Sequence, residues 1–316
     1  MGIGLWDRDS RNISSQESGE TVKRIWLNRK YIAKLASKWT SIIFAILGFI
    51  GTFASLGDLL PETSSIQYRI FISMGILVGL WTILCVFFSG YVSWKRRIEL
   101  FEASNGYHVY VQYGDVFSSE EVLKPEERRN IVIPVNRCFD TIVDDDLISS
   151  NTLHGITMKK MYASGTYTEQ TLNNVIQENL LVQKSEFEQI RQEDKRSGNL
   201  SRYSVGTVAE VKNTENCTYF FLGLSKFDRD LHAHTTNDEY VLALMRLLEF
   251  CNIRSQKYAV VMPLIGAGAS ETKKSERDIL EYLVKLLKMN KELINSDIHI
   301  VVRDSGKESI AITDIK

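Results

Sequence analysis

The feature that most constrains this chain is a run of 25 residues without a charged side chain, between Arg69 and Lys95. A second uncharged run, of 19 residues, lies between Lys38 and Asp58. An α-helix needs about 20 apolar residues to cross the hydrocarbon core of a bilayer. We therefore predict two transmembrane helices, at residues 39–57 and 70–94. A buried hairpin within a soluble protein is the alternative.

Basic residues are concentrated on the outer flanks of the two predicted spans. Six lysines and arginines lie within residues 23–38, and Lys95, Arg96 and Arg97 follow the second span. Because cytoplasmic flanks carry the excess of Lys and Arg, we predict a two-pass protein with both termini in the cytoplasm. Residues 1–38 would then be a cytoplasmic segment. Within it, residues 21–39 either form an amphipathic helix on the membrane surface or a solvated helix leading into the span.

Charge is distributed unevenly along the chain, although the formal net charge is only -1. Residues 1–100 contain 12 basic and 7 acidic side chains, which leaves 26 and 32 of the totals of 38 and 39 for the remainder. The acidic remainder lacks the clustered cations that nucleic acid requires, so we predict no nucleic-acid partner.

His232 and His234 lack a third ligand nearby, so we predict no metal site. Four widely spaced cysteines indicate a reducing compartment without disulfides: Cys85, Cys138, Cys217 and Cys251.

From about residue 100 the pattern changes to alternating strands and helices. Residues 107–117 alternate between apolar and polar, as a half-exposed strand does. Other strands are predicted at 130–136, 206–211, 217–225, 258–266 and 297–305, and helices at 167–196, 237–253 and 275–294. This order predicts one α/β domain over residues 100–316, with a mixed or largely parallel sheet between two helical layers, an α/β/α arrangement.

The strand predicted at 258–266 ends in a loop of very small residues, Gly266 to Ser270. Ligands of open α/β sheets bind beyond the carboxyl ends of strands. Glycine and alanine at such an end let backbone N–H groups approach a phosphate without a side chain between them. A purely structural turn is the alternative, because the sequence has neither the full P-loop nor the full dinucleotide-binding pattern.

Several of these segments, taken in order, resemble a macro domain, the ADP-ribose-binding fold. Residues 109–117 look like its first strand with a Gly-Asp step, and residues 130–136 like the next strand, which ends in asparagine. Residues 149–156 and 260–270 occupy the places of its two phosphate loops. The resemblance spans about residues 106–304. With two preceding spans, the chain most resembles the membrane-attached macro proteins of type II Thoeris-like bacterial antiphage systems.

The resemblance also implies where a ligand would bind. It implies that Asp115 receives an adenine amino group, that Asn136 meets a ribose, and that backbone N–H groups of the two loops hold a diphosphate. Hydrolytic members carry a second asparagine three residues after the first, where this chain has Phe139. We therefore predict no catalytic residue. The predicted ligand-binding residues are Asp115, Val116, Asn136, Ser150, Asn151, Leu153, His154, Gly155, Pro263, Leu264, Ile265, Gly266, Ala267, Gly268, Ala269 and Ser270.

The same resemblance implies a signalling function. A TIR-domain partner would make an ADP-ribose-derived signal, expected to be a histidine conjugate, and the macro domain would bind it. Binding would trigger homo-oligomerisation and disruption of the bacterial inner membrane. No cofactor is expected besides this ligand. The alternative is a membrane-anchored hydrolase that removes ADP-ribosyl groups.

Overall fold

The computed structural model describes residues 25–26, 28–51, 66–94, 97–266, 275–303, 310 and 312. The chain divides into two compact units, Met1–Arg96 with Ala311–Lys316, and Arg97–Ile310. Parts of four predictions lie outside the described residues: residues 1–24 and 27 of the N-terminal segment, residues 52–57 of the first span, Ala267–Ser270 of the small-residue loop, and residues 304–305 of the last predicted strand.

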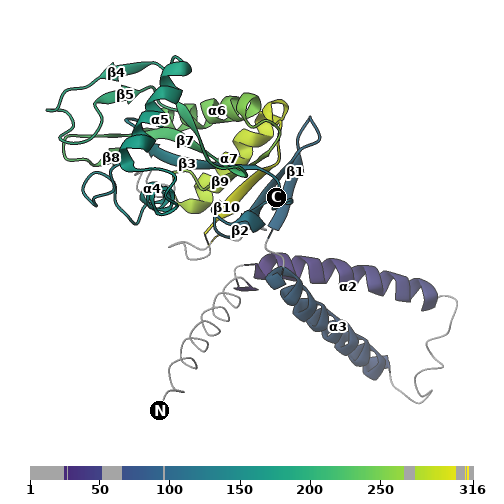
Figure 1. Cartoon of the computed structure of the whole chain (residues 1–316). Coiled ribbons are helices and arrows are strands. Elements are labelled where there is room, and N and C mark those ends of the chain that lie inside the picture. The colour runs from purple at the N-terminus through teal and green to yellow at the C-terminus, as the bar shows by residue number, and fades with distance from the viewer. Residues whose placement is uncertain are drawn as a thin grey trace, which may run out of the picture. The chain divides into compact units, whose positions relative to one another are not determined.

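The first unit contains two long helices, α2 (Arg29–Gly51) and α3 (Ile66–Trp94) (Figure 1). Both are long and apolar enough to cross a membrane, over Arg29–Phe49 and Ile70–Val92. On α3 the apolar side chains face outward, since Phe71 is 77% and Ile83 is 67% exposed. The two helices contact each other, and the Trp81 indole donates a hydrogen bond to the Ser37 hydroxyl at 3.1 Å. These features are consistent with a membrane hairpin, because such exposure is unfavourable in water.

The second unit is built on a mixed sheet in the order β1-β2-β10-β9-β3-β7-β6, with β8 paired to β7. Five central strands run parallel, and β1 and β6 lie antiparallel at the two edges. The strands are β1 (Arg97–Glu102), β2 (His108–Tyr113), β3 (Arg129–Asn136), β6 (Val208–Thr214), β7 (Cys217–Phe227), β8 (Ala233–His234), β9 (Ala259–Pro263) and β10 (Ile298–Val302).

Helices cover both faces of this sheet. On one face, α4 (Leu153–Ala163) and α5 (Glu169–Val182) pack on the side of β7 that carries Tyr219 and Phe221. On the other, α6 (Asn237–Arg254) receives the intervening Phe220, whose ring lies 5.1 Å from that of Phe250. Helix α7 (Glu276–Met289) lies beside α6, as the Tyr240–Tyr282 ring contact shows. Alternate side chains of a strand point to opposite faces, so the α/β/α expectation is confirmed.

Two local predictions are wrong. The strand at β2 is not half-exposed: Gln112 is only 1% exposed, because its amide is held in hydrogen bonds rather than solvated. The helix predicted at 167–196 ends at Val182. Lys184 then adopts a left-handed backbone with φ 54°, which ends a helix, and residues 187–189 pair with residues 201–203. That pair forms a separate small sheet, β4 (Phe187–Gln189) and β5 (Ser201–Tyr203). Two short 3₁₀ turns, η2 (Ser119–Glu121) and η3 (Lys291–Leu293), complete the unit.

Candidate functional site

The predicted ligand residues follow the carboxyl ends of parallel strands. Asp115 follows β2, Asn136 ends β3, and Leu264 to Gly266 follow β9. These three strands run parallel within one sheet, so their carboxyl ends lie at the same edge. Strands β10 and β9 separate β2 from β3, which puts the two ends about 14 Å apart at normal strand spacing. The topology therefore arranges these residues along one edge, as an extended ligand would need.

Asp115 presents its carboxylate to solvent at the end of β2. Its Oδ1 accepts a hydrogen bond from the Phe117 N–H at 3.1 Å, which fixes the side chain across the turn. Among the described residues, Oδ2 accepts no hydrogen bond, so it is available to an external donor such as an aromatic amine. The next predicted residue, Val116, is 4% exposed and packs in the core. Only its backbone could meet a ligand.

Asn136 differs, because its side chain is only 3% exposed. Its Oδ1 accepts from the Cys138 N–H at 3.0 Å. Its Nδ2 makes no hydrogen bond of normal geometry among the described residues, although it lies near enough to Asp140 to lower the pKa of that carboxyl against the larger effect of burial. The predicted ribose contact would require this amide to be uncovered, and it stays a prediction.

The segment from Ser149 to Gly155 closes on itself before α4. The Ser150 N–H donates to Asp145 at 2.6 Å, the Thr152 N–H to the Ser149 carbonyl at 3.1 Å, and the Asn151 N–H to the Ser149 hydroxyl at 3.4 Å. A Cβ on Gly155 would lie 2.2 Å from the Ser149 carbonyl oxygen, so this close turn requires glycine.

Those internal hydrogen bonds reduce the number of backbone N–H groups that can bind a phosphate. The Gly155 N–H donates to the N-cap hydroxyl of Thr152 at 3.1 Å. The N–H groups of Leu153 and His154, the first two residues of α4, have no acceptor in the part of the chain that the structure describes. A helix N-terminus attracts anions through such groups. We therefore expect a phosphate to meet these two, rather than the N–H groups of Ser150 or Asn151.

The ring of His154 belongs to the loop interior. It is 8% exposed, and its Nε2 lies 3.1 Å from the Asp140 carbonyl oxygen. Burial lowers the pKa of His154 to about 4, so the ring is neutral at pH 7 and donates from Nε2 to that carbonyl. The side chain therefore stabilises the β3–α4 loop, and any ligand contact of His154 would come from its backbone.

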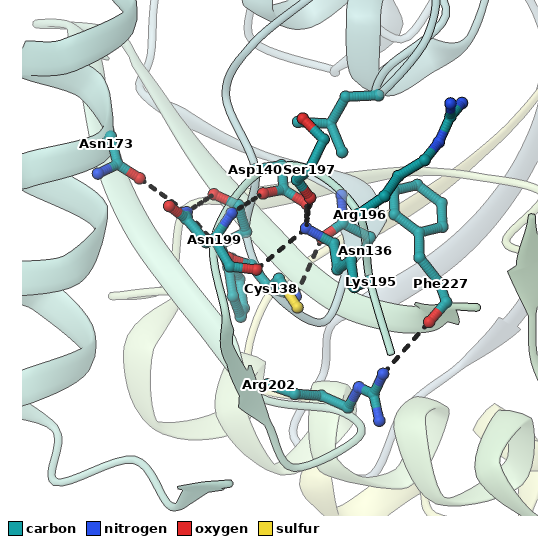
Figure 2. A network of polar contacts seen from close by, with 12 residues as sticks. Asn136, Cys138, Asp140, Asn173, Lys195, Arg196, Ser197, Asn199, Arg202 and Phe227 are labelled. Atoms are coloured by element: carbon teal, nitrogen blue, oxygen red, sulfur yellow. Dashed lines mark hydrogen bonds and ion pairs between the residues drawn. The ribbon is translucent and has the colours of Figure 1, made fainter. Parts of the chain in front are cut away.

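A buried ion pair holds the loop after β3 (Figure 2). Lys195 Nζ lies 2.9 Å from Asp140 Oδ2, and the two side chains are 0% and 1% exposed. The ammonium also donates hydrogen bonds to the carbonyls of Ser197 at 2.6 Å and Asn199 at 3.0 Å. Burial raises the pKa of Asp140, and the contact with Lys195 opposes this. The pair ties the loop after β3 to the segment before β5, as Figure 2 shows.

Asn199 and Gly198 complete this network. The Asn199 N–H donates to Asp140 Oδ1 at 2.6 Å, and its side-chain amide donates to the carbonyl of Cys138 at 3.1 Å. A Cβ on Gly198 would lie 2.3 Å from Asp140 Oδ1 and 2.7 Å from Lys195 Nζ. This arrangement could not be predicted from the sequence, because Lys195 lies in a charged run that has the pattern of a solvated helix.

The β9 end is described only as far as Gly266. Pro263 and Leu264 are partly exposed, whereas Ile265 is 0% exposed and its carbonyl accepts from the Tyr240 hydroxyl at 2.8 Å. Gly266 has φ 93°, a backbone conformation that other residues rarely adopt. The strand therefore turns sharply where the small-residue loop was predicted to begin.

Two further sequence features have structural roles. Phe139 is 1% exposed, with its ring 5.5 Å from that of Tyr203, so the position of the second asparagine of hydrolytic macro domains is part of the core. His234 lies 3.0 Å and His232 3.5 Å from Asp228. Across the described residues, no group of three or more His, Cys, Asp or Glu side chains is placed to hold a metal ion.

Comparison with known proteins agrees with this fold. Residues 109–303 match the family described as Thoeris protein ThsA, Macro domain. The chain is also 30% identical over 251 residues to Thoeris protein ThsA of Bacillus amyloliquefaciens (strain Y2), an alignment that covers 79% of this chain and 76% of that protein. The resemblance inferred from short segments is confirmed. The chain belongs to the Thoeris ThsA family, and residues 109–303 are its macro domain.

Proposed function

We propose that this protein is a receptor and membrane effector of Thoeris antiphage defence, whose macro domain binds an ADP-ribose-derived signal. The observation that carries the proposal is the alignment of Asp115, Asn136 and the α4 N-terminus along the carboxyl edge of a macro-domain sheet. The signal we favour is a histidine conjugate of ADP-ribose, made by a TIR-domain protein of the same defence system.

Each part of such a ligand has a chemically suitable group at this edge. The free Oδ2 of Asp115 can accept from the adenine amino group, and the N–H groups of Leu153 and His154 can hold the diphosphate. Gly266, with its positive φ, stands where the second phosphate loop is expected to begin. Asn136 would meet the distal ribose once its amide is uncovered.

Binding without turnover is the activity that the residues support. Phe139 offers no polar group where hydrolytic macro domains have their second asparagine. In the acidic run after it, two carboxylates stabilise the backbone of their own loop. Asp144 Oδ1 accepts from the Leu147 N–H at 2.7 Å, and Asp145 Oδ1 from the Ser150 N–H at 2.6 Å. A hydrolase remains the alternative that the experiment below tests directly.

The two apolar helices would carry out the response to ligand at the membrane. We place α2 and α3 across the bacterial inner membrane with both termini in the cytoplasm, because their flanks carry the Lys and Arg excess. Ligand binding would shift an assembly equilibrium, so that several hairpins come together and disrupt the membrane. Gly75 and Gly79 lie one turn apart on α3 with open space at the Cβ positions, a spacing that allows close helix contact in lipid.

The test uses full-length protein. Calorimetric titration in detergent with ADP-ribose and its histidine conjugate measures binding, and chromatography of the same samples detects product. Dye-loaded liposomes of bacterial lipids measure leakage. We expect binding of at least one ligand, no product, and ligand-dependent leakage. Asp115→Ala should weaken binding about tenfold or more, since it removes a hydrogen bond to a charged group.

The matched control is Glu215→Ala. Glu215 is an exposed carboxylate in the β6–β7 turn, at the amino end of β7 and so at the opposite edge of the sheet. Its removal should leave binding unchanged. Absence of binding to either ligand would contradict the receptor proposal, and release of product would favour the hydrolase.

A further inference from the structure

The edge of the sheet that carries Asp115 contains a second buried polar network, formed by Arg97, Gln112 and Glu121. Arg97 is the first residue of β1 and comes three residues after Trp94, the last residue of α3. Its guanidinium donates from Nε to Gln112 Oε1 at 2.7 Å, and from Nη2 to the carbonyls of Glu120 at 3.1 Å and Glu121 at 2.8 Å. One side chain next to the membrane helix in sequence therefore holds the 3₁₀ turn η2.

The network continues through Gln112 to Glu121. The Gln112 amide donates to the Glu121 carbonyl at 2.8 Å and also to Glu121 Oε2. On its other side, Gln112 Oε1 lies 3.2 Å from Nδ1 of the buried His299, a contact that places the ring proton on Nδ1. Gln112 and Glu121 are 1% and 8% exposed. Because these groups lie away from water, displacement of any one of them leaves the others without a solvent substitute.

Glu121 connects this network to the candidate ligand residue. Its Oε1 accepts the backbone N–H of Asp115 at 3.0 Å. The carboxylate lies directly on Gly114, where an added Cβ would be 1.9 Å from Glu121 Oε1. Gly114 and Asp115 therefore have different roles. Gly114 leaves room for the Glu121 carboxylate, and the backbone of Asp115 is hydrogen-bonded to that carboxylate.

The charges are arranged to keep the network intact. Burial lowers the pKa of Arg97, and attraction to Glu121 opposes that shift, so the guanidinium stays charged at pH 7. Arg97 also lies 5.8 Å from the ring of Tyr110, which stacks on His299 at 4.9 Å. The planar guanidinium meets three acceptors at once, which a lysine could not reproduce.

Resting on the proposed function, we propose that Arg97, Gln112 and Glu121 couple ligand binding at Asp115 to the membrane helix α3. A ligand that binds the Asp115 carboxylate displaces the turn after β2, because Glu121 accepts the Asp115 N–H. This displacement changes the hydrogen bonds of Arg97 to Glu120 and Glu121. Only two residues separate Arg97 from the last residue of α3. Arg97 and Glu121 are thus positioning residues for the response, whereas Asp115 is a contact residue. The coupling between ligand binding and the membrane helix is a free energy, set by how the ligand changes these contacts. A variant can therefore lose the response to ligand and still bind it.

The experiment separates binding from leakage in full-length protein. The variants are Arg97→Met and Glu121→Gln, with Arg128→Met as the matched control. Arg128 is also a half-buried arginine, which contacts Thr218 at 3.1 Å and Glu210 at 3.6 Å near the amino ends of β3 and β7. Titration with ADP-ribose and its histidine conjugate gives affinity, and dye-loaded liposomes give ligand-dependent leakage. The melting temperature of each variant reports folding.

We expect Arg97→Met and Glu121→Gln to bind ligand within about threefold of the unsubstituted protein while leakage falls about tenfold, in the range of coupling energies between sites. Arg128→Met should leave both unchanged. If Arg97→Met does not fold, Arg97→Lys replaces it, since lysine keeps the charge and loses the three-acceptor geometry. Leakage at the unsubstituted level in the Arg97 and Glu121 variants would overturn the proposal, as would a parallel loss of binding and leakage. Failure of the unsubstituted protein to bind any ligand would instead refute the proposed function.

Discussion

The loops that follow β2 and β3 both bring a polar residue to the carboxyl edge, but they hold it in different ways. After β2, the Asp115 carboxylate is exposed, and a single buried carboxylate, Glu121, holds its backbone. After β3, the Asn136 amide is buried, and the Asp140–Lys195 ion pair holds the whole following loop. The first arrangement leaves a side chain free to meet a ligand. The second holds the β3–α4 loop rigid and leaves the backbone N–H groups at the start of α4 accessible to a ligand.

This difference separates the parts that the two loops would play in signalling. Asp115 lies in an exposed turn and is held by hydrogen bonds to Phe117, Ser118 and Glu121, so it can move when a ligand binds, and its movement can be transmitted. A loop built around desolvated charges is costly to distort, because an unpaired buried charge has no compensation. We therefore expect changes in the β3 loop to appear mainly in stability, and changes near Asp115 mainly in binding and response.

The largest expected effect follows loss of the Lys195 ammonium. Lys195→Met leaves the buried Asp140 carboxylate without its counter-ion, and breaking such a pair costs about 3–5 kcal/mol of unfolding free energy. Urea unfolding of the full-length protein measures this. Near-UV circular dichroism of tyrosine is the suitable signal for the macro domain, because all five tryptophans precede Arg97.

Two companion variants test whether charge is the cause. Arg196→Met removes the neighbouring residue, whose ion pair with Asp146 is half-exposed, and should cost less than about 1 kcal/mol. Adding Asp140→Asn to Lys195→Met removes the unpaired charge and should restore part of the loss. If Lys195→Met proves no more destabilising than Arg196→Met, the buried pair does not hold the loop as argued.

The second effect is a pH dependence that arises in the same loop. Burial lowers the pKa of His154 from 6.5 to about 4. As pH falls below 6.5, the unfolded chain takes up a proton that the folded protein excludes. Stability therefore decreases between about pH 6.5 and 4, and this group contributes no further loss below pH 4. Its contribution at pH 5 is a loss of about 2 kcal/mol relative to pH 7.

The His154→Gln variant isolates this contribution. Unfolding free energies of the full-length protein at pH 7 and pH 5 are compared with and without the substitution. Other groups titrate in both proteins and cancel in the comparison, so the variant should lose less stability on acidification. Equal losses in the two proteins would show that the His154 ring is not held neutral in the folded state.

A third effect contrasts the glycines of the two loops. A Cβ at Gly155 meets the backbone oxygen of Ser149, whereas one at Gly114 meets the end of the Glu121 side chain, which can shift further than a backbone atom at the cost of its buried hydrogen bonds. Gly155→Ala should therefore cost about 3 kcal/mol, and Gly114→Ala about 1 kcal/mol, within the range for overpacking. Gly114→Ala should nonetheless reduce ligand-dependent leakage, since it displaces the Glu121 carboxylate that holds the backbone of Asp115.

Gly106→Ala is the control for this contrast. Gly106 has φ 78° with nothing within 4 Å of its Cβ position, so alanine there adds backbone strain alone. Melting temperatures and ligand-dependent leakage of the three variants give the ranking. A larger destabilisation from Gly114→Ala than from Gly155→Ala would contradict the view that the β3 loop is the more rigid of the two.

The sequence predicted the strand ends more reliably than the contacts that hold them. Local patterns place β3, β7 and β9 correctly, because short apolar runs bounded by polar residues are strong strand signals. The burial of the Gln112 and Lys195 side chains could not be predicted in this way. Gln112 occupies a polar position of an alternating strand, and Lys195 lies in a charged run. The burial of each depends on a partner outside its own segment, Glu121 for Gln112 and Asp140 for Lys195.

The predicted helix at 167–196 failed for a related reason. Good helix formers continue past Val182, but the pairing of residues 187–189 with residues 201–203 overrides that preference. The same pairing brings Lys195 under the β3 loop. The sequence predicted which strand ends carry the candidate residues. Which N–H groups of residues 149–155 remain open to a ligand depends on the internal hydrogen bonds of that segment, which the sequence does not reveal.

The smallest expected effect concerns the helix caps. At α6, Thr236 and Glu239 cap each other's backbone N–H groups, so a carboxylate already occupies that N-terminus. At α4, the residue equivalent to Glu239 is Gly155, which has no side chain, and the N–H groups of Leu153 and His154 stay open to an anion. Thr152→Ala and Thr236→Ala should each cost about 1 kcal/mol of stability. Only Thr152→Ala should also reduce the rise in melting temperature that ADP-ribose produces, because only the α4 cap lies in the proposed site. Equal ligand-induced shifts in both variants would remove α4 from the phosphate site, and leave the anion to the loop that follows Gly266.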